Sequence, residues 1–503
     1  MTTRSLNLLF IQADQLKPQV LGCYGGPALT PHIDALAARG TLFESAYCNF
    51  PLCAPSRFSM LSGLLPSTIG AYDNGAEYKA ETPTIAHYLR TAGYRTVLAG
   101  KQHFVGPDQL HGFHERLVPE LYPTDFSWTP SWDETRMESN NDATGVTRAG
   151  VCVRSAQMDH DEATLYRASA QLHDFARDRQ QPFFLAASFT HPHEPYFCEQ
   201  QYWDRYKDTD IPMPVTVLQP DSERLLYTQR MLEHYGLLDD RLHGEAIRTA
   251  RHAYLGNVSY FDDMVGQLLN ILDDTGMADS TAIVLTADHG DMLGEHGLWF
   301  KKHFLEDCAR VPLLVVMPGA KGGARSPANV SLVDVLPTLC DLAGVDANTL
   351  SPEPLDGISL LPACDGAATL FDRPVYAENT SESVPSPMFM VRRGRHKLIT
   401  GGDAPDALFA LDSDPQELRN RAVEPGQAGI HQSLRDLAQA RWDVASLTQN
   451  VTRSQKRRRL VDHSHQDGHR VRWAASIADP MTPWLLRDEG QYNDWAWRGI
   501  DES

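Results

Sequence analysis

The predicted fold rests on one stretch near the N-terminus, Leu6-Asn7-Leu8-Leu9-Phe10-Ile11-Gln12-Ala13-Asp14. A short and mostly apolar run that ends in polar residues is typical of a central parallel strand buried on both faces. Similar runs recur at Thr96–Ala99 before Gly100-Lys101, Phe183–Phe189 before Thr190-His191, Thr281–Ala287 before Asp288-His289, and Val311–Val316. We therefore predict five strands of one buried sheet.

Long helical patterns separate these strands, notably around residues 161–178 and 245–273. Strands alternating with helices indicate an α/β fold with a large doubly wound sheet, mixed or parallel, flanked by helices. Ligands bind such sheets outside the carboxyl ends of the strands. The predicted site therefore lies where the strands end, at Asp14, Lys101-Gln102-His103, His191-Pro192-His193 and Asp288-His289.

Beyond about residue 370 the pattern changes to short strands and a helix. The strands are expected at Pro374–Tyr376, Met388–Val391, Lys397–Thr400 and Leu408–Leu411, with a helix near 430–447. We predict a catalytic α/β domain over residues 1–370 and a smaller C-terminal α+β domain over 371–503, which ends in an irregular tail rich in Trp.

The charge balance excludes some classes of partner. The 503 residues include 45 Lys and Arg against 65 Asp and Glu, a net charge of −20. Such a chain is not expected to bind nucleic acid or anionic membranes, which need basic surfaces. The basic run Lys456-Arg457-Arg458-Arg459 is interpreted as a solvated helix face or loop. An anionic substrate would require a local cluster of cations.

The expected location is the cytoplasm. Eight scattered cysteines form no CxxC pair, which suits a reducing compartment. The apolar run from Leu6 to Ile11 is too short for a secretory signal, and no stretch is long enough for a membrane helix.

Two sets of polar residues suggest chemistry on a tetrahedral oxyanion. Asp14, Asp288 and His289 could bind a hard cation such as Ca²⁺, Mg²⁺ or Mn²⁺, and the imidazole leaves Mn²⁺ or Zn²⁺ open. The cations Arg57, Lys101, His191 and Lys301 could surround the anion. Sulfuryl or phosphoryl transfer needs this positioning and charge neutralisation.

The run Cys53-Ala54-Pro55-Ser56-Arg57, followed by Leu61-Ser62-Gly63, resembles the signature of type I sulfatases of the alkaline phosphatase superfamily. The resemblance implies that a formylglycine-generating maturation enzyme oxidises Cys53 to formylglycine. One hydroxyl of the aldehyde hydrate would attack sulfur, and loss of the proton from the other would release sulfate. If Cys53 opens a helix, Arg57 returns to the same face.

The same resemblance assigns roles. The ligands of one divalent ion (Ca²⁺, Mn²⁺ or Mg²⁺) would be Asp14, the formylglycine at Cys53, Asp288 and His289, and the catalytic set would be Cys53, Arg57, Lys101, His103, His191 and Lys301. His103 would be the base that breaks the hemiacetal, and His191 would protonate the leaving oxygen or bind sulfate. Many members have two consecutive Asp at the first metal position; here it is Ala13-Asp14, so one oxygen ligand is missing or comes from Gln15.

Within that family the chain resembles the choline sulfatase branch. The matching motifs are Ala71-Tyr72-Asp73-Asn74, Gly100-Lys101-Gln102-His103, Val105–Phe113 and Gly297-Leu298-Trp299-Phe300-Lys301. The resemblance implies a small-molecule sulfate ester as substrate, with Trp128 and Glu378 holding the quaternary ammonium. The stretch Ser139–Asp142 and the tail from Trp484 to Ser503, with Trp495 and Trp497, depart from the branch. We further expect a homo-oligomer, a dimer or a tetramer.

Three alternatives stay open. The substrate could be an aryl or another alkyl sulfate. The same groups could serve a phosphonate monoester or phosphodiester hydrolase, which parallel kcat/KM values on both ester types would distinguish. The chain could also be a non-catalytic binding protein that keeps Cys53 as a thiol, which peptide mass spectrometry over residues 53–57 would reveal.

Overall fold

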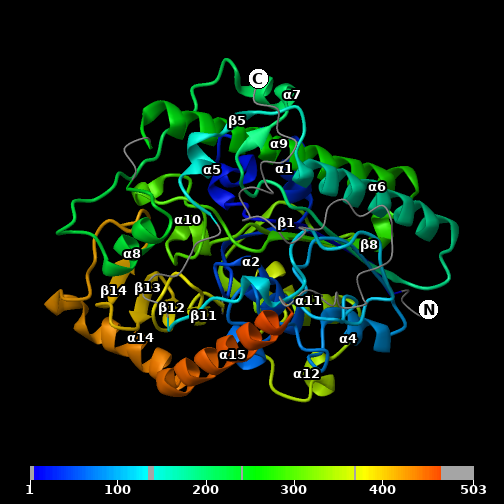
Figure 1. Cartoon of the computed structure of the whole chain (residues 1–503). Coiled ribbons are helices and arrows are strands. Elements are labelled where there is room, and N and C mark those ends of the chain that lie inside the picture. The colour runs from blue at the N-terminus through cyan, green and yellow to red at the C-terminus, as the bar shows by residue number, and fades with distance from the viewer. Residues whose placement is uncertain (1–4, 134–140, 239–241, 367–369, 466–503) are drawn as a thin grey trace.

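The computed structural model describes residues 5–133, 141–238, 242–366 and 370–465. Its centre is an eight-stranded sheet with the order β10-β2-β9-β8-β1-β6-β3-β4 (Figure 1). The strands of this sheet are β1 (Asn7–Ala13), β2 (Thr41–Tyr47), β3 (Arg95–Gly100), β4 (Glu115–Arg116), β6 (Phe183–Ser188), β8 (Thr281–Ala287), β9 (Leu313–Val316) and β10 (Ala324–Ser331). A separate short ladder joins β5 (Gly150–Val151) to β7 (Phe197–Cys198).

Strand β1 confirms the role predicted for the opening stretch. It pairs in parallel with β6 on one side and β8 on the other, and Leu8 to Ala13 are buried. Strand β9 runs antiparallel to β8 and β2, so the sheet is mixed. The sequence did not predict β2 or β10. Strand β10 lies at the edge, contains Pro327 and has an irregular register between Ser326 and Asn329, so its pattern is weak.

Helices cover both faces of the sheet (Figure 1). Helices α1, α6 and α9 lie together on one side, and α2, α4 and α11 lie together on the other. The helix bounds are α1 (Pro31–Arg39), α2 (Cys53–Ser62), α3 (Pro66–Ile69), α4 (Ile85–Thr91), α5 (Thr144–Thr147), α6 (Ala156–Arg177), α7 (Gln200–Trp203), α8 (Leu226–His234), α9 (Gly244–Asp274), α10 (Glu306–Ala309), α11 (Val335–Leu342), α12 (Ala347–Leu350), α13 (Leu361–Cys364), α14 (Ala428–Arg441) and α15 (Val444–Ser464). This two-sided covering confirms the doubly wound α/β prediction.

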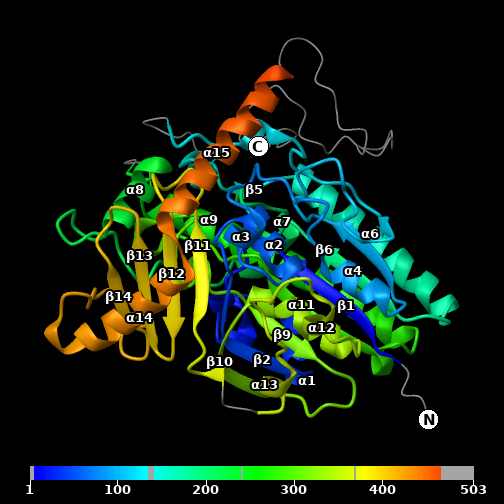
Figure 2. The same cartoon turned by 90° about the horizontal axis from the view of Figure 1, so that it is seen from below.

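A second sheet is antiparallel and has the order β11-β12-β13-β14. Its strands are β11 (Val375–Asn379), β12 (Met388–Arg393), β13 (His396–Gly401) and β14 (Ala407–Ala410). One face, with Met390 and Phe409, joins the main core, whereas the other face packs against α14 and α15 (Figure 2). Strand β11 begins at Val375, close to the predicted domain boundary at residue 370. That boundary stays a proposal.

The basic run at 456–459 lies on α15, but it is not all solvated. Arg458 is buried, and its two terminal nitrogens donate to the carboxylate of Asp73 at 2.6 and 2.7 Å. The interpretation of this run as a solvated face is therefore wrong for Arg458. Among the described helices, none is both long enough and apolar enough to cross a bilayer. Ser139, Asn140 and the tail from Trp484 to Ser503 lie outside the described residues.

Candidate active site

Four neighbouring strands end at the same edge of the main sheet. In spatial order they are β8, β1, β6 and β3, and they lead into Asp288, Asp14, the segment 191–193 and Lys101. Parallel strands bring their carboxyl ends together, so residues up to 274 positions apart in the sequence meet here. This convergence confirms the expected position of the site.

Helix α2 brings Cys53 to this edge. The helix begins at Cys53, and all ten of its residues are buried. The backbone N–H of Ala54 donates to Oδ1 of Asn74 at 3.0 Å, and the Ser56 hydroxyl donates to the carbonyl of Asp288 at 2.5 Å. These two bonds fix the first turn of α2 against the end of β8.

The four residues predicted as metal ligands lie together. Asp14, Cys53, Asp288 and His289 are buried, and each offers a ligand atom within 4.8 Å of the others. The Cys53 sulfur lies 3.3 Å from Nε2 of His289 and 3.8 Å from Oδ1 of Asp14. Two carboxylates and one imidazole form a donor set that suits a divalent cation.

The electrostatics at this cluster favour positive charge. Burial alone would lower the pKa of His289, but Asp288 and Cys53 outweigh it and raise that pKa to about 9. Burial alone would raise the pKa of Asp14, whereas Lys101, His193 and Arg57 hold it well below its usual range. The carboxylate of Asp14 is therefore ionised and available to a cation.

Arg57 lies one helical turn after Cys53 and is fully buried. Its Nη2 donates to Oδ2 of Asp14 at 2.8 Å, and its Nη1 donates to the carbonyl of Lys101 at 2.7 Å. Together with its bond to Asp288, these contacts join the ends of three strands. Arg57 therefore positions the carboxylates of the cluster.

Lys101 and His103 follow β3 into the site. Nζ of Lys101 forms an ion pair with Oδ2 of Asp14 at 2.6 Å and lies 4.0 Å from the ring centroid of Tyr122. Neither ring nitrogen of the buried His103 has a hydrogen-bond partner among the described residues. Burial and Lys101 lower the pKa of His103 to about 3, so its imidazole is neutral near pH 7.

Trp128 lies beside His103. The two ring centroids are 5.7 Å apart, and the Trp128 ring is 5.4 Å from that of Tyr122. Aromatic surface therefore lies next to the predicted base.

His193, rather than His191, lies beside Lys301. Nε2 of His193 contacts Nζ of Lys301 and is 3.9 Å from Oδ1 of Asp14. Nζ of Lys301 also donates to Oε1 of Gln15 at 2.8 Å. The prediction chose the first histidine of His-Pro-His. The motif alone does not show which of the two rings faces the edge of the sheet.

His191 turns toward helix α6. Its Nδ1 lies 2.7 Å from Oδ2 of Asp161, and its ring packs edge-on against Tyr260 at 4.8 Å. Asp161 also accepts the backbone N–H groups of Thr190 and His191 at 2.7 and 2.9 Å. The described contacts of His191 thus hold the loop after β6 in place.

Gln15 follows Asp14 and is the residue that was considered as the source of the missing oxygen ligand at the first metal position. Its Oε1 accepts a hydrogen bond from Nζ of Lys301, and its Nε2 donates to Oδ2 of Asp291 at 2.6 Å. Its backbone N–H donates to Oδ1 of Asp288 at 3.0 Å, and its φ is +60°. In this arrangement Gln15 links Lys301 to the metal-ligand cluster.

Glu378 is buried, and its carboxylate accepts three hydrogen bonds from protein groups. Oε2 accepts the N–H of Ser67 at 2.7 Å, and Oε1 accepts the Ser67 hydroxyl and Nε1 of Trp442, both at 2.6 Å. These contacts attach β11 to α3 and to the end of α14. They suggest a structural role for the carboxylate that was predicted to hold a quaternary ammonium.

Comparisons with known proteins agree with this geometry. The model of the family described as Sulfatase matches residues 6–345, and that of the C-terminal region of N-sulphoglucosamine sulphohydrolase matches residues 294–442. The chain is 39% identical over 487 residues to choline-sulfatase of Rhizobium meliloti, with 94% of each chain covered. It is 29% identical to arylsulfatase of Clostridium perfringens, over 82% of this chain and 89% of that one. Its fold matches the solved phosphonate monoester hydrolase of Silicibacter pomeroyi with a TM-score of 0.69 and 25% identity, over 86% of this chain and 94% of that one.

Proposed function

The chain belongs to the sulfatase family, and from this premise we propose that it hydrolyses a choline-sulfate-like alkyl sulfate, using a formylglycine formed from Cys53 and one divalent metal ion. Sulfate-ester hydrolysis follows from the family. The nucleophile, the ion, the individual roles and the alcohol are the proposal.

One observation carries this proposal. The ligand atoms of Asp14, Cys53, Asp288 and His289 lie within 4.8 Å of one another, and Arg57, Lys101, His103, His193 and Lys301 surround them. A negatively charged sulfate ester needs the local cations Arg57, Lys101 and Lys301 because the whole chain carries a net charge of −20.

The residues present fit a divalent cation. The donor set is two carboxylates, an imidazole and the side chain at position 53, and the charges around His289 favour an added positive charge. When bound, such an ion would act as a Lewis acid and lower the pKa of a hydroxyl group among its ligands. The two carboxylates and His289 would hold the ion, and Arg57 would orient the carboxylates.

The remaining side chains would act on the substrate. Lys101 and Lys301 would neutralise the sulfate oxygens, and the neutral imidazole of His103 would take the proton that releases sulfate. Burial lowers the pKa of Lys301, but Cys53 and Glu194 outweigh it, so the pKa is raised and the ammonium stays charged. The role predicted for His191 would pass to His193, whose contact with Lys301 supports it.

The alcohol is proposed from two observations. The relative that is 39% identical is a choline-sulfatase, and the aromatic rings of Trp128 and Tyr122 lie beside His103. Aromatic faces attract a quaternary ammonium. The contacts of Glu378 do not support its part in this recognition.

A phosphonate monoester hydrolase is the second candidate. It is favoured by the fold match with a TM-score of 0.69 to such an enzyme, and both substrates are tetrahedral oxyanions. The same lysines and nucleophile would serve either reaction.

The test is a substrate panel on protein matured by a formylglycine-generating enzyme. We expect kcat/KM to be highest for choline sulfate, lower for 4-nitrophenyl sulfate and lowest for a phenylphosphonate monoester. A higher value for the phosphonate would overturn the proposed substrate class, and a higher value for the aryl sulfate would overturn the alcohol.

Matched variants test the nucleophile and the ion. Cys53→Ala should abolish turnover, whereas Cys48→Ala, at another buried cysteine five positions earlier, should retain it. Peptide mass spectrometry should find formylglycine at position 53. Elemental analysis should find one divalent ion per wild-type chain and much less in Asp288→Asn. Full activity of Cys53→Ala would contradict the assignment of the nucleophile.

A further inference from the structure

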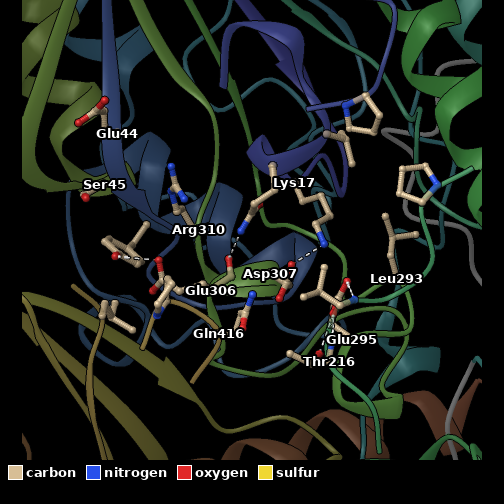
Figure 3. A pocket seen from close by; sticks show the side chains of 18 of the residues that line it. Lys17, Glu44, Ser45, Thr216, Leu293, Glu295, Glu306, Asp307, Arg310 and Gln416 are labelled. Carbon is tan, nitrogen blue, oxygen red and sulfur yellow. Dashed lines mark hydrogen bonds and ion pairs between the residues drawn. The ribbon is translucent and has the colours of Figure 1, made fainter. Parts of the chain in front are cut away.

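The structure contains a cavity of about 560 Å³ (Figure 3). Its walls come from the segment after β1, from β2, from helices α9 and α10, and from the second sheet with the loop after β14. None of Asp14, Cys53, Asp288 and His289 lines it. The volume falls in the range of about 300–1,000 Å³ that is typical of small-molecule sites.

Each carboxylate that lines this cavity already has a cation. The pairs are Asp307 with Lys17, Glu295 with Arg251 at 3.6 Å, Glu44 with Arg325 at 2.8 Å, Glu306 with Lys397 at 2.8 Å, and Asp412 with Arg395 at 2.9 Å. Each of these carboxylates therefore already forms an ion pair with a cation of the protein.

Two arginines in the wall have no such partner. Among the described residues, neither Arg310 nor Arg392 forms an ion pair, and the buried Nε of Arg310 and Nη1 of Arg392 have no hydrogen-bond acceptor. Arg392 is only 6% exposed, so its charge is almost fully removed from water. A buried and unpaired charge is costly, and an anion beside it would offset that cost.

The two arginines lie near the same residue, Tyr47. Nε of Arg392 donates to the hydroxyl of Tyr47 at 3.1 Å, and the backbone of Arg310 forms an antiparallel bridge with Tyr47. The Tyr47 hydroxyl in turn donates to Glu306 at 3.2 Å. Both arginines thus belong to the part of the cavity wall around Tyr47. Figure 3 shows Arg310 and Glu306 in the same part of the cavity.

The rest of the wall includes a large apolar part. It is formed by Val20, Pro27, Met213, Val215, Leu293 and Leu411, among others. A free inorganic anion would leave this surface uncovered, whereas an organic anion would bury hydrocarbon against it.

We propose that this cavity binds a small organic carboxylate, whose head group pairs with Arg310 and Arg392 and whose hydrocarbon part lies against the apolar wall. The planar guanidinium groups match the geometry of a carboxylate. This site is separate from sulfate-ester hydrolysis and does not depend on the proposed mechanism.

The test is titration calorimetry of the full chain with 2-naphthoate and, as its uncharged counterpart, 2-naphthamide. We expect naphthoate to bind at least about tenfold more tightly, since hydrogen bonds to charged groups contribute about 1.5–3 kcal/mol. Arg310→Met and Arg392→Met should each weaken naphthoate binding by at least about tenfold. Arg395→Met is the matched control: this arginine lines the same cavity but is paired with Asp412, so affinity should stay within about twofold.

Two further measurements separate this cavity from the candidate active site and from an effect on folding. Cys53→Ala should bind naphthoate like the wild type, and Arg310→Met should keep the wild-type melting temperature and sulfatase kcat/KM. Equal affinity for naphthoate and naphthamide, no binding of naphthoate, loss of binding in Cys53→Ala, or unchanged binding in Arg310→Met would each overturn the proposal. If Arg392→Met does not fold, the partly exposed Arg310 still decides the outcome.

Discussion

Nε of Arg57 donates to Oδ2 of Asp288 at 2.8 Å, and this bond joins the first helix turn after Cys53 to the end of β8. Both side chains are fully buried. Burial alone would lower the pKa of Arg57, but Asp288 and Asp14 raise it above its ordinary value, so the guanidinium is permanently charged. One arginine therefore pairs with two buried carboxylates and orders them.

Replacing Arg57 by Ala should reduce stability strongly, because it leaves two buried carboxylates without their arginine. We expect the free energy of unfolding to fall by about 3–5 kcal/mol. Urea denaturation in the presence of a chelator measures this, so that no bound cation takes the place of the guanidinium. Arg325→Ala removes an exposed partner of Glu44 and should cost less than about 1 kcal/mol. Equal losses in the two variants would contradict the prediction.

Variants of the two histidines in the segment after β6 should differ in kcat/KM. His193→Asn removes the imidazole that contacts Lys301 and should lower kcat/KM for a sulfate ester by about 100-fold or more. His191→Asn removes the bond to Asp161 and should lower the melting temperature while changing kcat/KM by less than about tenfold. Steady-state kinetics and thermal melts of both variants decide. The opposite ranking would restore the role first predicted for His191.

Glu378→Gln should change stability rather than substrate affinity. Three donors, from Ser67 and Trp442, point at the two carboxylate oxygens, and a Gln side chain would bring an NH₂ group against at least one of them. We expect a loss of about 1–3 kcal/mol in unfolding free energy and an unchanged KM for choline sulfate. A rise of more than about tenfold in KM with unchanged stability would show that Glu378 contacts the ammonium.

The sequence was sufficient to predict the central strands and the edge of the sheet where the site lies. Continuous apolar runs such as 281–287 have one physical cause, burial on both faces, and polar residues directly after them must lie at the carboxyl edge. Strand β2, with Glu44 and Ser45 only partly buried, lacks that pattern and was missed. Strand β10 was also missed; it lies at the edge of the sheet, where one side of a strand is unpaired, and it contains Pro327.

The sequence signals for helix ends agree with the structure at α1 but not at the start of α4. Thr30-Pro31 is a typical helix start and Gly40 a typical helix end, and α1 begins and ends at these positions. Thr82-Pro83 has the same pattern, but α4 begins later and is capped by Thr84, whose backbone N–H donates to Nδ1 of His87 at 3.1 Å. Both threonines are plausible caps, and the reciprocal bond with His87 favours the second.

Side-chain orientation was beyond sequence reasoning. The spacing of His191 and His193 allows either ring to face the site, and the choice depends on Asp161, which lies 30 positions earlier on α6 and binds His191. Glu378 was likewise assigned from its position in the sequence, but its side chain is held by a hydrogen bond from Trp442, which follows α14. Contacts between distant elements decide both cases.

A buried triad between the main domain and the second sheet should make stability depend on pH. Nζ of Lys397, on β13, lies 2.8 Å from Glu306 and 2.5 Å from Glu417. One lysine cannot fully compensate two carboxylates, and burial together with Glu306 raises the pKa of Glu417 from 4.5 to about 7. Between these two values the folded chain holds a proton that the unfolded chain has released.

Stability contributed by this proton is therefore present below about pH 4.5 and is lost as the pH rises through about 7. Glu417→Gln removes the titration but keeps an oxygen to accept the backbone N–H of Glu306. Its unfolding free energy should fall less than that of the wild type between about pH 5.5 and about pH 8, by up to about 1.4 kcal/mol per pH unit. Urea denaturation across this range measures the two slopes, with Glu44→Gln as an exposed control that should follow the wild type. Parallel slopes for wild type and Glu417→Gln would mean that Glu417 is ionised throughout, with Lys397 dominating its environment.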